Sequence, residues 1–186
     1  MSSQINTLLE QTLEARKDAL QAQRQDRFEE AKRILVNAEG ICRNSGDKAG
    51  LARTLKALGQ IERDLGSPEA ALPLYEEAVS ICRGEPDVLA FAHAIRHLGD
   101  IQRKLGRLES AESHYREALA IYRDHPEADV LDLANAIRGL AVLTFDTGGD
   151  EEAKALWQEA LNLYASVKVQ AGVDESSRRL ALLASR

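Results

Sequence analysis

Apolar residues recur along this chain at intervals of three and four positions, which is the spacing of one face of an α-helix. One such stripe is formed by Leu51, Leu55, Leu58, Ile61 and Leu65. Short stretches such as Gly66-Ser67-Pro68 and Gly148-Gly149-Asp150 separate the stripes, and their residues are typical of a helix end followed by a helix start. The pattern therefore predicts an all-α chain of paired helices.

The helical pairs belong to a repeat of 40 to 42 residues that occurs three times. Each copy begins with either Leu or Ile, has Leu three residues later, and has either Gly or Ala directly after that Leu. Further on, each copy has an Ala, then either Tyr or Trp, and then a second Ala. The matching positions include Leu58, Leu98 and Leu140; Gly59, Gly99 and Ala141; Ala71, Ala111 and Ala153; and Tyr75, Tyr115 and Trp157. Small residues let two helices approach closely, and we expect the aromatic residue to fill the gap to the next unit.

The repeat predicts a single repeat domain over residues 1–186. Its four repeats would span residues 5–44, which is degenerate, and then 49–84, 88–124 and 130–166, with a capping helix at 173–186. A hairpin of this kind cannot bury its apolar face alone, so the ends of the array need caps. We expect one cap to contain Ile5, Leu8, Leu9 and Leu13, and the other Val173, Leu180 and Leu183.

The repeat resembles the tetratricopeptide repeat family, whose signature is W-x2-L-G-x2-Y, then A-x3-F and Pro. The resemblance covers residues 5–186 and is strongest over 49–166. Leu55, Ile95 and Ile137 replace the leading Trp. The period exceeds the family's usual length of about 34 residues, which is similar to the longer-period branch found in kinesin light chains. The resemblance implies an all-α, right-handed superhelical solenoid of helical hairpins.

In this family the first helix of each repeat lines a concave surface that receives a peptide or a partner helix. The resemblance implies that the inward-facing, mostly basic positions here are Arg53, Lys56, Gln60, Arg63, His93, Arg96, Asp100, Arg103, Lys104, Asn135, Arg138, Val142 and Phe145. Because the whole chain has a net charge of -6, a basic face favours an anionic segment, such as an acidic peptide. The alternative is a solvated helix face supported by pairs such as Asp100 with Lys104.

His93 and His97 lie at i and i+4 with Asp100 beyond them, a spacing that can present three metal ligands on one helix face. The stretch H-A-I-R-H lacks the Glu of the zinc-hydrolase motif, and Arg96 would oppose a cation. We therefore predict no metal site. No phosphate-binding, dinucleotide-binding or serine-hydrolase motif occurs either, so we predict neither an enzyme nor a cofactor.

Nucleic-acid binding is not expected, because Phe145 is the only aromatic residue of the inward-facing set and aspartates interrupt its positive charge. No stretch of the sequence approaches the length of an apolar membrane span, and the first residues lack the features of a secretory signal, so we expect a cytoplasmic chain. Cys42 and Cys82 are expected to remain thiols.

The sequence thus predicts a non-catalytic protein–protein interaction scaffold that binds a peptide or protein partner, acidic by the charge argument, in its concave groove. Two alternatives stay open. One is a self-assembling protein that forms a homodimer through its end helices. The other is a regulatory module that senses a small ligand.

Overall fold

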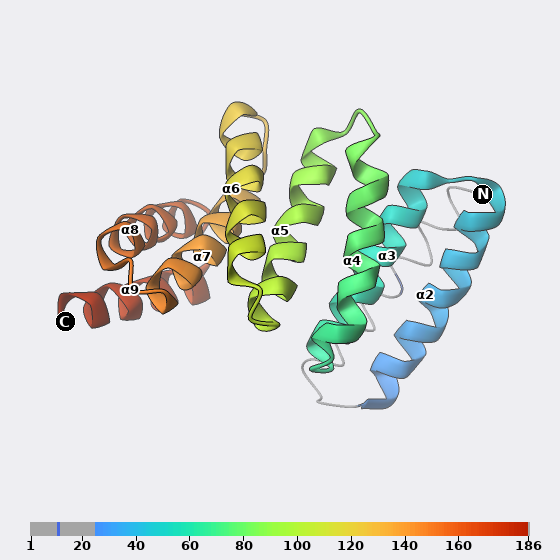
Figure 1. Ribbon diagram of the computed structural model, residues 1–186, viewed down its shortest axis with the longest axis horizontal. Coiled ribbons are helices and arrows are strands. Elements are labelled where there is room, and N and C mark those ends of the chain that lie inside the picture. The colour runs from blue at the N-terminus through green and yellow to red at the C-terminus, as the bar shows by residue number, and fades with distance from the viewer. Residues whose placement is uncertain (1–10, 12–24, 186) are drawn as a thin grey trace. The chain divides into compact units, whose positions relative to one another are not determined.

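The computed structural model describes residue 11 and residues 25–185, and this part of the chain is helical apart from its turns (Figure 1). One compact unit ends at Asp87 and contains α2 (Gln25–Ser45), α3 (Lys48–Asp64) and α4 (Pro68–Arg83). Another begins at Val88 and contains α5 (Val88–Lys104), α6 (Leu108–Asp124), α7 (Val130–Asp146), α8 (Asp150–Ser166) and α9 (Gln170–Ala184). The predicted all-α fold of helical hairpins is confirmed, whereas the repeat boundaries stay a prediction.

The predicted N-terminal cap, Ile5, Leu8, Leu9 and Leu13, lies outside the described residues. Among the helices that the structure describes, none is both long and apolar enough to cross a membrane.

The same turn joins the two helices of each complete hairpin; these hairpins are α3–α4, α5–α6 and α7–α8. Gly66, Gly106 and Gly148 have φ values of 81°, 73° and 85°, in the left-handed region where a side chain would be strained. The residue after each glycine donates its N–H to the carbonyl five residues earlier, as Ser67 does to Glu62 at 2.9 Å. These bonds satisfy carbonyl groups at the helix end, so the hairpins turn back in the same way.

A buried aromatic ring belongs to the second helix of each complete hairpin, and in the first two hairpins it lies on a glycine. Tyr75, Tyr115 and Trp157 are fully buried, as the repeat predicted. A Cβ atom added to Gly59 would lie 2.7 Å from Cε2 of Tyr75, and one added to Gly99 would lie 3.1 Å from Cε1 of Tyr115. The absence of a side chain at these glycines is therefore what lets the ring lie against the first helix.

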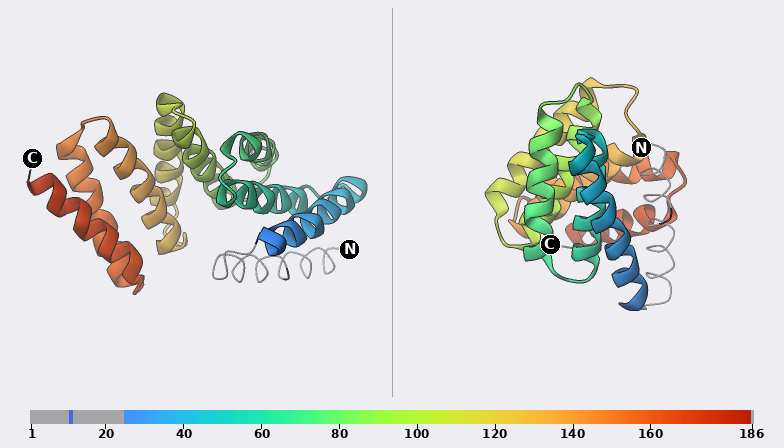
Figure 2. Two further views of the ribbon diagram at one scale, coloured as in Figure 1. Left: turned by 90° about the horizontal axis from the view of Figure 1, so that it is seen from below. Right: turned by 90° about the vertical axis from the view of Figure 1, so that its right-hand side faces the viewer.

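In the second unit the helices pack in chain order. α5 packs on α6, α6 on α7, α7 on α8 and α8 on α9, and the last three lie side by side in Figure 2. The ring of Tyr115 joins two hairpins, because a Cβ atom added to Gly139 on α7 would lie only 2.5 Å from its Cε1 atom. α5 also touches α7 directly, so the first helices of successive hairpins adjoin.

A cation–π contact is one of the contacts that hold the last helix against the hairpin before it. The guanidinium carbon of Arg179 on α9 lies 5.2 Å from the ring centroid of Phe145 and 5.9 Å from that of Trp157. Val173, Leu180 and Leu183, the residues expected to close this end, are half-buried.

Both cysteines are buried as free thiols. Burial raises the pKa of Cys42 and of Cys82 above the ordinary value. A buried thiol with a raised pKa is a poor nucleophile, so these residues contribute to packing rather than to chemistry.

The ring contacts predict opposite outcomes for two Gly→Ala changes. Gly139→Ala is expected to lower the stability by about 1–2 kcal/mol, because overpacking against the buried Tyr115 ring outweighs the gain in helix propensity. Gly40→Ala in α2, where no atom lies within 4 Å of the added Cβ, is expected to raise it by about 0.5–1 kcal/mol. Thermal unfolding of both variants tests this. Equal stabilisation by the two changes would contradict the packing.

Candidate partner-binding face

Two stripes of predicted inward residues lie next to each other in the second unit. On α5 the stripe is His93, Arg96, Asp100, Arg103 and Lys104, and on α7 it is Asn135, Arg138, Val142 and Phe145. Ion pairs between the helices join them: Arg96 Nη2 lies 3.7 Å from Asp132 Oδ1, and Arg103 Nη1 lies 3.7 Å from Asp146 Oδ2. We call these two stripes together the α5–α7 face.

The remaining predicted residues lie on α3, in the other compact unit. Arg53 is exposed, and Lys56, Gln60 and Arg63 are half-buried. The guanidinium of Arg63 lies 3.1 Å from the carboxylate of Asp64, the next residue. Its charge is thus already balanced within the chain.

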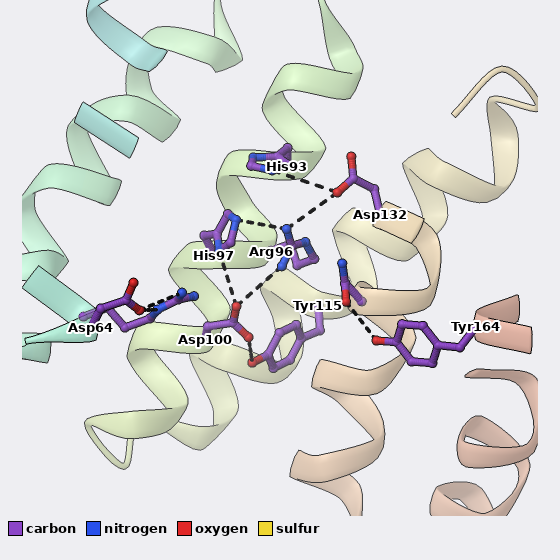
Figure 3. A network of polar contacts seen from close by, with 10 residues as sticks. Asp64, His93, Arg96, His97, Asp100, Tyr115, Asp132 and Tyr164 are labelled. Carbon is purple, nitrogen blue, oxygen red and sulfur yellow. Dashed lines mark hydrogen bonds and ion pairs between the residues drawn. The ribbon is translucent and has the colours of Figure 1, made fainter. Parts of the chain in front are cut away.

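Arg96 is the most deeply buried cation of the α5–α7 face, with 8% of its side chain exposed. Its Nη2 atom donates a hydrogen bond to Nε2 of His97 at 2.9 Å, and its Nη1 atom lies 3.6 Å from Oδ2 of Asp100 (Figure 3). Burying a guanidinium is costly unless carboxylates balance its charge. Asp100 and Asp132 supply that balance from two helices.

The hydrogen bond from Arg96 also fixes the tautomer of His97. A guanidinium can only donate, so Nε2 of His97 accepts, and the ring proton is on Nδ1. This atom lies 3.4 Å from Oδ2 of Asp100. The ring of His93 packs edge-on against His97 with centroids 4.6 Å apart, and its Nε2 atom lies 3.9 Å from Asp132. The two histidines therefore belong to the same polar cluster as Arg96.

Asp100 connects this cluster to the hairpin core. Its Oδ1 atom accepts a hydrogen bond of 2.7 Å from the hydroxyl of Tyr115 on α6. Burial alone would raise the pKa of Asp100, but hydrogen bonds from His97 and Tyr115 and the charge of Arg96 outweigh it, so this pKa lies well below its ordinary value. Asp100 is thus charged at neutral pH.

The α7 stripe is fixed by α8 and α9. Tyr164 donates its hydroxyl to Oδ1 of Asn135 at 2.8 Å, and Arg138 Nε donates to Oε2 of Glu175 at 2.6 Å. Burial raises the pKa of Tyr164 to about 12, so its hydroxyl remains a donor. Val142 is buried, and Phe145 is half-buried beneath Arg179.

The positive charge that the sequence places on this face is largely paired within the chain. Sequence reasoning missed Asp132 and Glu175, the acidic partners of Arg96 and Arg138, because they lie about one repeat further along. A search for opposite charges one period apart could have found them. Asp100 has Arg96 as its ion-pair partner, whereas Lys104, the partner considered in the sequence, is exposed.

No group of three or more potential ligands that could hold a metal occurs among residues 25–185. In the cluster of His93 and His97, the Nε2 atom of His97 accepts a hydrogen bond from a cationic guanidinium.

Comparisons with known proteins agree with this architecture. The family model described as tetratricopeptide repeat matches residues 19–84 and 90–167. No match was found among curated proteins.

Two solved structures are similar to the chain at 18% sequence identity. The first is a signal transduction ATPase with numerous domains, with a tetratricopeptide repeat sensor, from Pyrococcus horikoshii; its TM-score is 0.73, and the match covers 85% of this chain but 24% of that one. The chain thus spans about a quarter of that protein. The second is BtubC (BKLC) from P. vanneervenii, with a TM-score of 0.57 and 100% and 92% of the two chains covered. At this identity the likeness shows the fold alone.

The low pKa of Asp100 predicts an acid-dependent contribution to stability. A carboxyl whose pKa is lower in the folded state stabilises the fold above its unfolded pKa of about 3.9, and this contribution is lost as the pH falls. Asp100→Asn should therefore destabilise the protein by about 2 kcal/mol at pH 7, and the difference from wild type should shrink below about pH 4. Denaturant unfolding at several pH values measures this.

The exposed Asp124→Asn is the control for that series and should change little at any pH. A constant difference between Asp100→Asn and wild type from pH 7 to pH 3 would contradict the assigned charge state.

Proposed function

The chain belongs to the tetratricopeptide repeat family, and from this premise we propose that it binds a segment of a partner protein on the α5–α7 face. Repeats of this family generally mediate protein–protein interaction, and its members are typically non-catalytic scaffolds. We propose the same role for this chain. The supporting observation is that side chains of the face are already ordered by contacts with their own and neighbouring helices.

This order lowers the cost of binding. A long charged side chain that is mobile before binding loses conformational freedom when a partner fixes it. The guanidinium groups of Arg96 and Arg138 are fixed beforehand by His97 and Glu175. A partner segment would therefore meet a preformed surface, and its fit to that surface would determine specificity.

The C-terminal end of α5 supports an acidic residue in the partner. Lys104 is exposed there, and Arg103 beside it is half-buried, with its Nη1 atom 3.7 Å from Oδ2 of Asp146. A carboxylate of the partner could approach both cations. Because exposed ion pairs contribute little individually, we assign selectivity to them and most of the affinity to shape and buried contacts.

Charge reversal at the half-buried Arg103 and the exposed Lys104 tests the face while Arg96, His97 and Asp100 keep their own side chains. Arg103→Glu combined with Lys104→Glu should weaken retention of a partner about tenfold or more, because it repels the acidic residue. Affinity capture from source-cell lysate, quantified by mass spectrometry, measures this against wild type.

The matched control is Lys154→Glu. Lys154 is an exposed lysine on α8, which is the second helix of its hairpin. It should retain the same partner as wild type. Equal retention by all three proteins would contradict the α5–α7 face as the binding surface.

A further inference from the structure

One guanidinium nitrogen of the α5–α7 face lies between two partners on different helices. Arg96 Nη2 donates a hydrogen bond of 2.9 Å to Nε2 of His97, which is on the same helix, α5. The same nitrogen lies 3.7 Å from Oδ1 of Asp132 on α7 (Figure 3). The shorter contact is with a neutral ring, because a guanidinium donates and the ring nitrogen accepts. Which partner holds Arg96 therefore depends on whether His97 can accept a hydrogen bond.

A second proton on His97 removes this acceptor. A neutral imidazole has one accepting nitrogen, whereas both nitrogens of the charged ring donate. The ring and the guanidinium would then be two cationic donors 2.9 Å apart. Their repulsion is weakly screened, because only 8% of each side chain is exposed. The charged ring keeps Asp100 as a partner, since Oδ2 of Asp100 lies 3.4 Å from its Nδ1 atom. Protonation therefore displaces Arg96 rather than the ring.

The groups around His97 leave the histidines as the side chains that change charge near neutral pH. Within this unit α5 packs against α6 and α7. Burial raises the pKa of both facing tyrosines of α6, Tyr115 and Tyr122, that of Tyr122 to about 12, so both stay neutral. Asp100 stays charged because its pKa is lowered. Histidine is the side chain that ordinarily changes charge between pH 5 and pH 8. The other charged or titratable groups of the cluster are His93, Arg96 and Arg103 on α5, and Asp132 and Arg138 on α7.

Asp132 is a second position for the guanidinium that lies close at hand. A charge-assisted hydrogen bond between a guanidinium and a carboxylate is about 2.7–2.9 Å long, so an approach of about 1 Å by Arg96 would form one. His93 Nε2 also lies 3.9 Å from Asp132. A charged His93 would share Asp132 with Arg96 rather than exclude it, because a carboxylate has two accepting oxygen atoms.

We propose that His97 and Arg96 form a pH-dependent switch, in which a second proton on His97 moves the guanidinium of Arg96 from His97 to Asp132. In the neutral form this guanidinium nitrogen is held within α5. In the acid form it joins α5 to α7, and the His97 ring adds a positive charge to the α5–α7 face. The face thus has two arrangements, and pH selects between them. The switch belongs to the free chain, so it does not rest on a partner binding there.

The switch is tested by NMR on the full chain, labelled with ¹⁵N and ¹³C and titrated from pH 8 to pH 5. We expect His97 to carry its proton on Nδ1 at pH 8 and to gain a second proton, on Nε2, during the titration. With the same midpoint, nuclear Overhauser effects from the Arg96 guanidinium to the His97 ring should weaken at least twofold. Those to the β protons of Asp132 should strengthen at least twofold.

Three results of this titration would overturn the proposal. They are an Nε2 atom of His97 that carries a proton at pH 8, an Nε2 atom that is still unprotonated at pH 5, and contacts of Arg96 that do not change when His97 becomes charged.

Two variants identify the residue that drives the change. His97→Gln keeps a side chain that can accept a hydrogen bond but cannot take up a proton, so the contacts of Arg96 should stay constant from pH 8 to pH 5. His93→Gln is the matched control. It removes the other histidine of the cluster, and the transfer of Arg96 should remain as in wild type. A transfer that persists in His97→Gln, or that disappears in His93→Gln, would show that His97 does not drive it and overturns the proposal.

Denaturant unfolding measures the new ion pair independently of NMR. In the His93→Gln background, where the charge of His93 cannot contribute, Asp132→Asn should raise the unfolding equilibrium constant. The factor by which it does so should be at least threefold larger at pH 5 than at pH 8. This pH dependence should disappear when His97→Gln is added. An equal factor at both pH values overturns the proposal, and the charge-reversal test of partner binding at Arg103 and Lys104 is unaffected by either result.

Discussion

The packing of a tyrosine ring on a glycine is the contact on which the α3–α4 and α5–α6 hairpins depend. Tyr115 shows this most fully, because its ring lies against Gly99 in its own hairpin and Gly139 in the next. From α6, this one ring therefore contacts both α5 and α7. Left-handed glycines such as Gly106 then return the chain so that the ring and its glycine meet.

The polar cluster of the α5–α7 face depends on that packing. The Tyr115 ring brings its hydroxyl to Asp100, and Asp100 in turn lies beside His97 and Arg96. Low exposure strengthens these contacts and makes the loss of any one of them costly. The α5–α7 face is thus ordered from its buried side, because Asp100, one of its own residues, is held by Tyr115 from the hairpin core.

The fold could be predicted from the sequence because period, turn residues and ring positions are local signals that occur three times. Burial of Tyr75, Tyr115 and Trp157 followed from the same register. The charge of the face could not be predicted in this way. Arg96 has Asp100 four residues further along its own helix, but its second partner, Asp132, is distant in sequence. Arg138 pairs with Glu175, which is equally distant. Side-chain conformations in the folded chain decide such pairings.

The position that Gly139 occupies makes the order of the hairpins specific. On α9 the same register position is Arg179, 40 residues later. Each of these residues meets the ring of the preceding hairpin: Gly139 lies under Tyr115, and the guanidinium of Arg179 lies over Trp157. If α7 and α9 exchanged places, a long cation would enter a space that has no room for a methyl group. The hairpins share one residue pattern, but their order in the chain therefore cannot be changed freely. A duplicated or transplanted repeat needs a matching residue at this position in the helix that follows it.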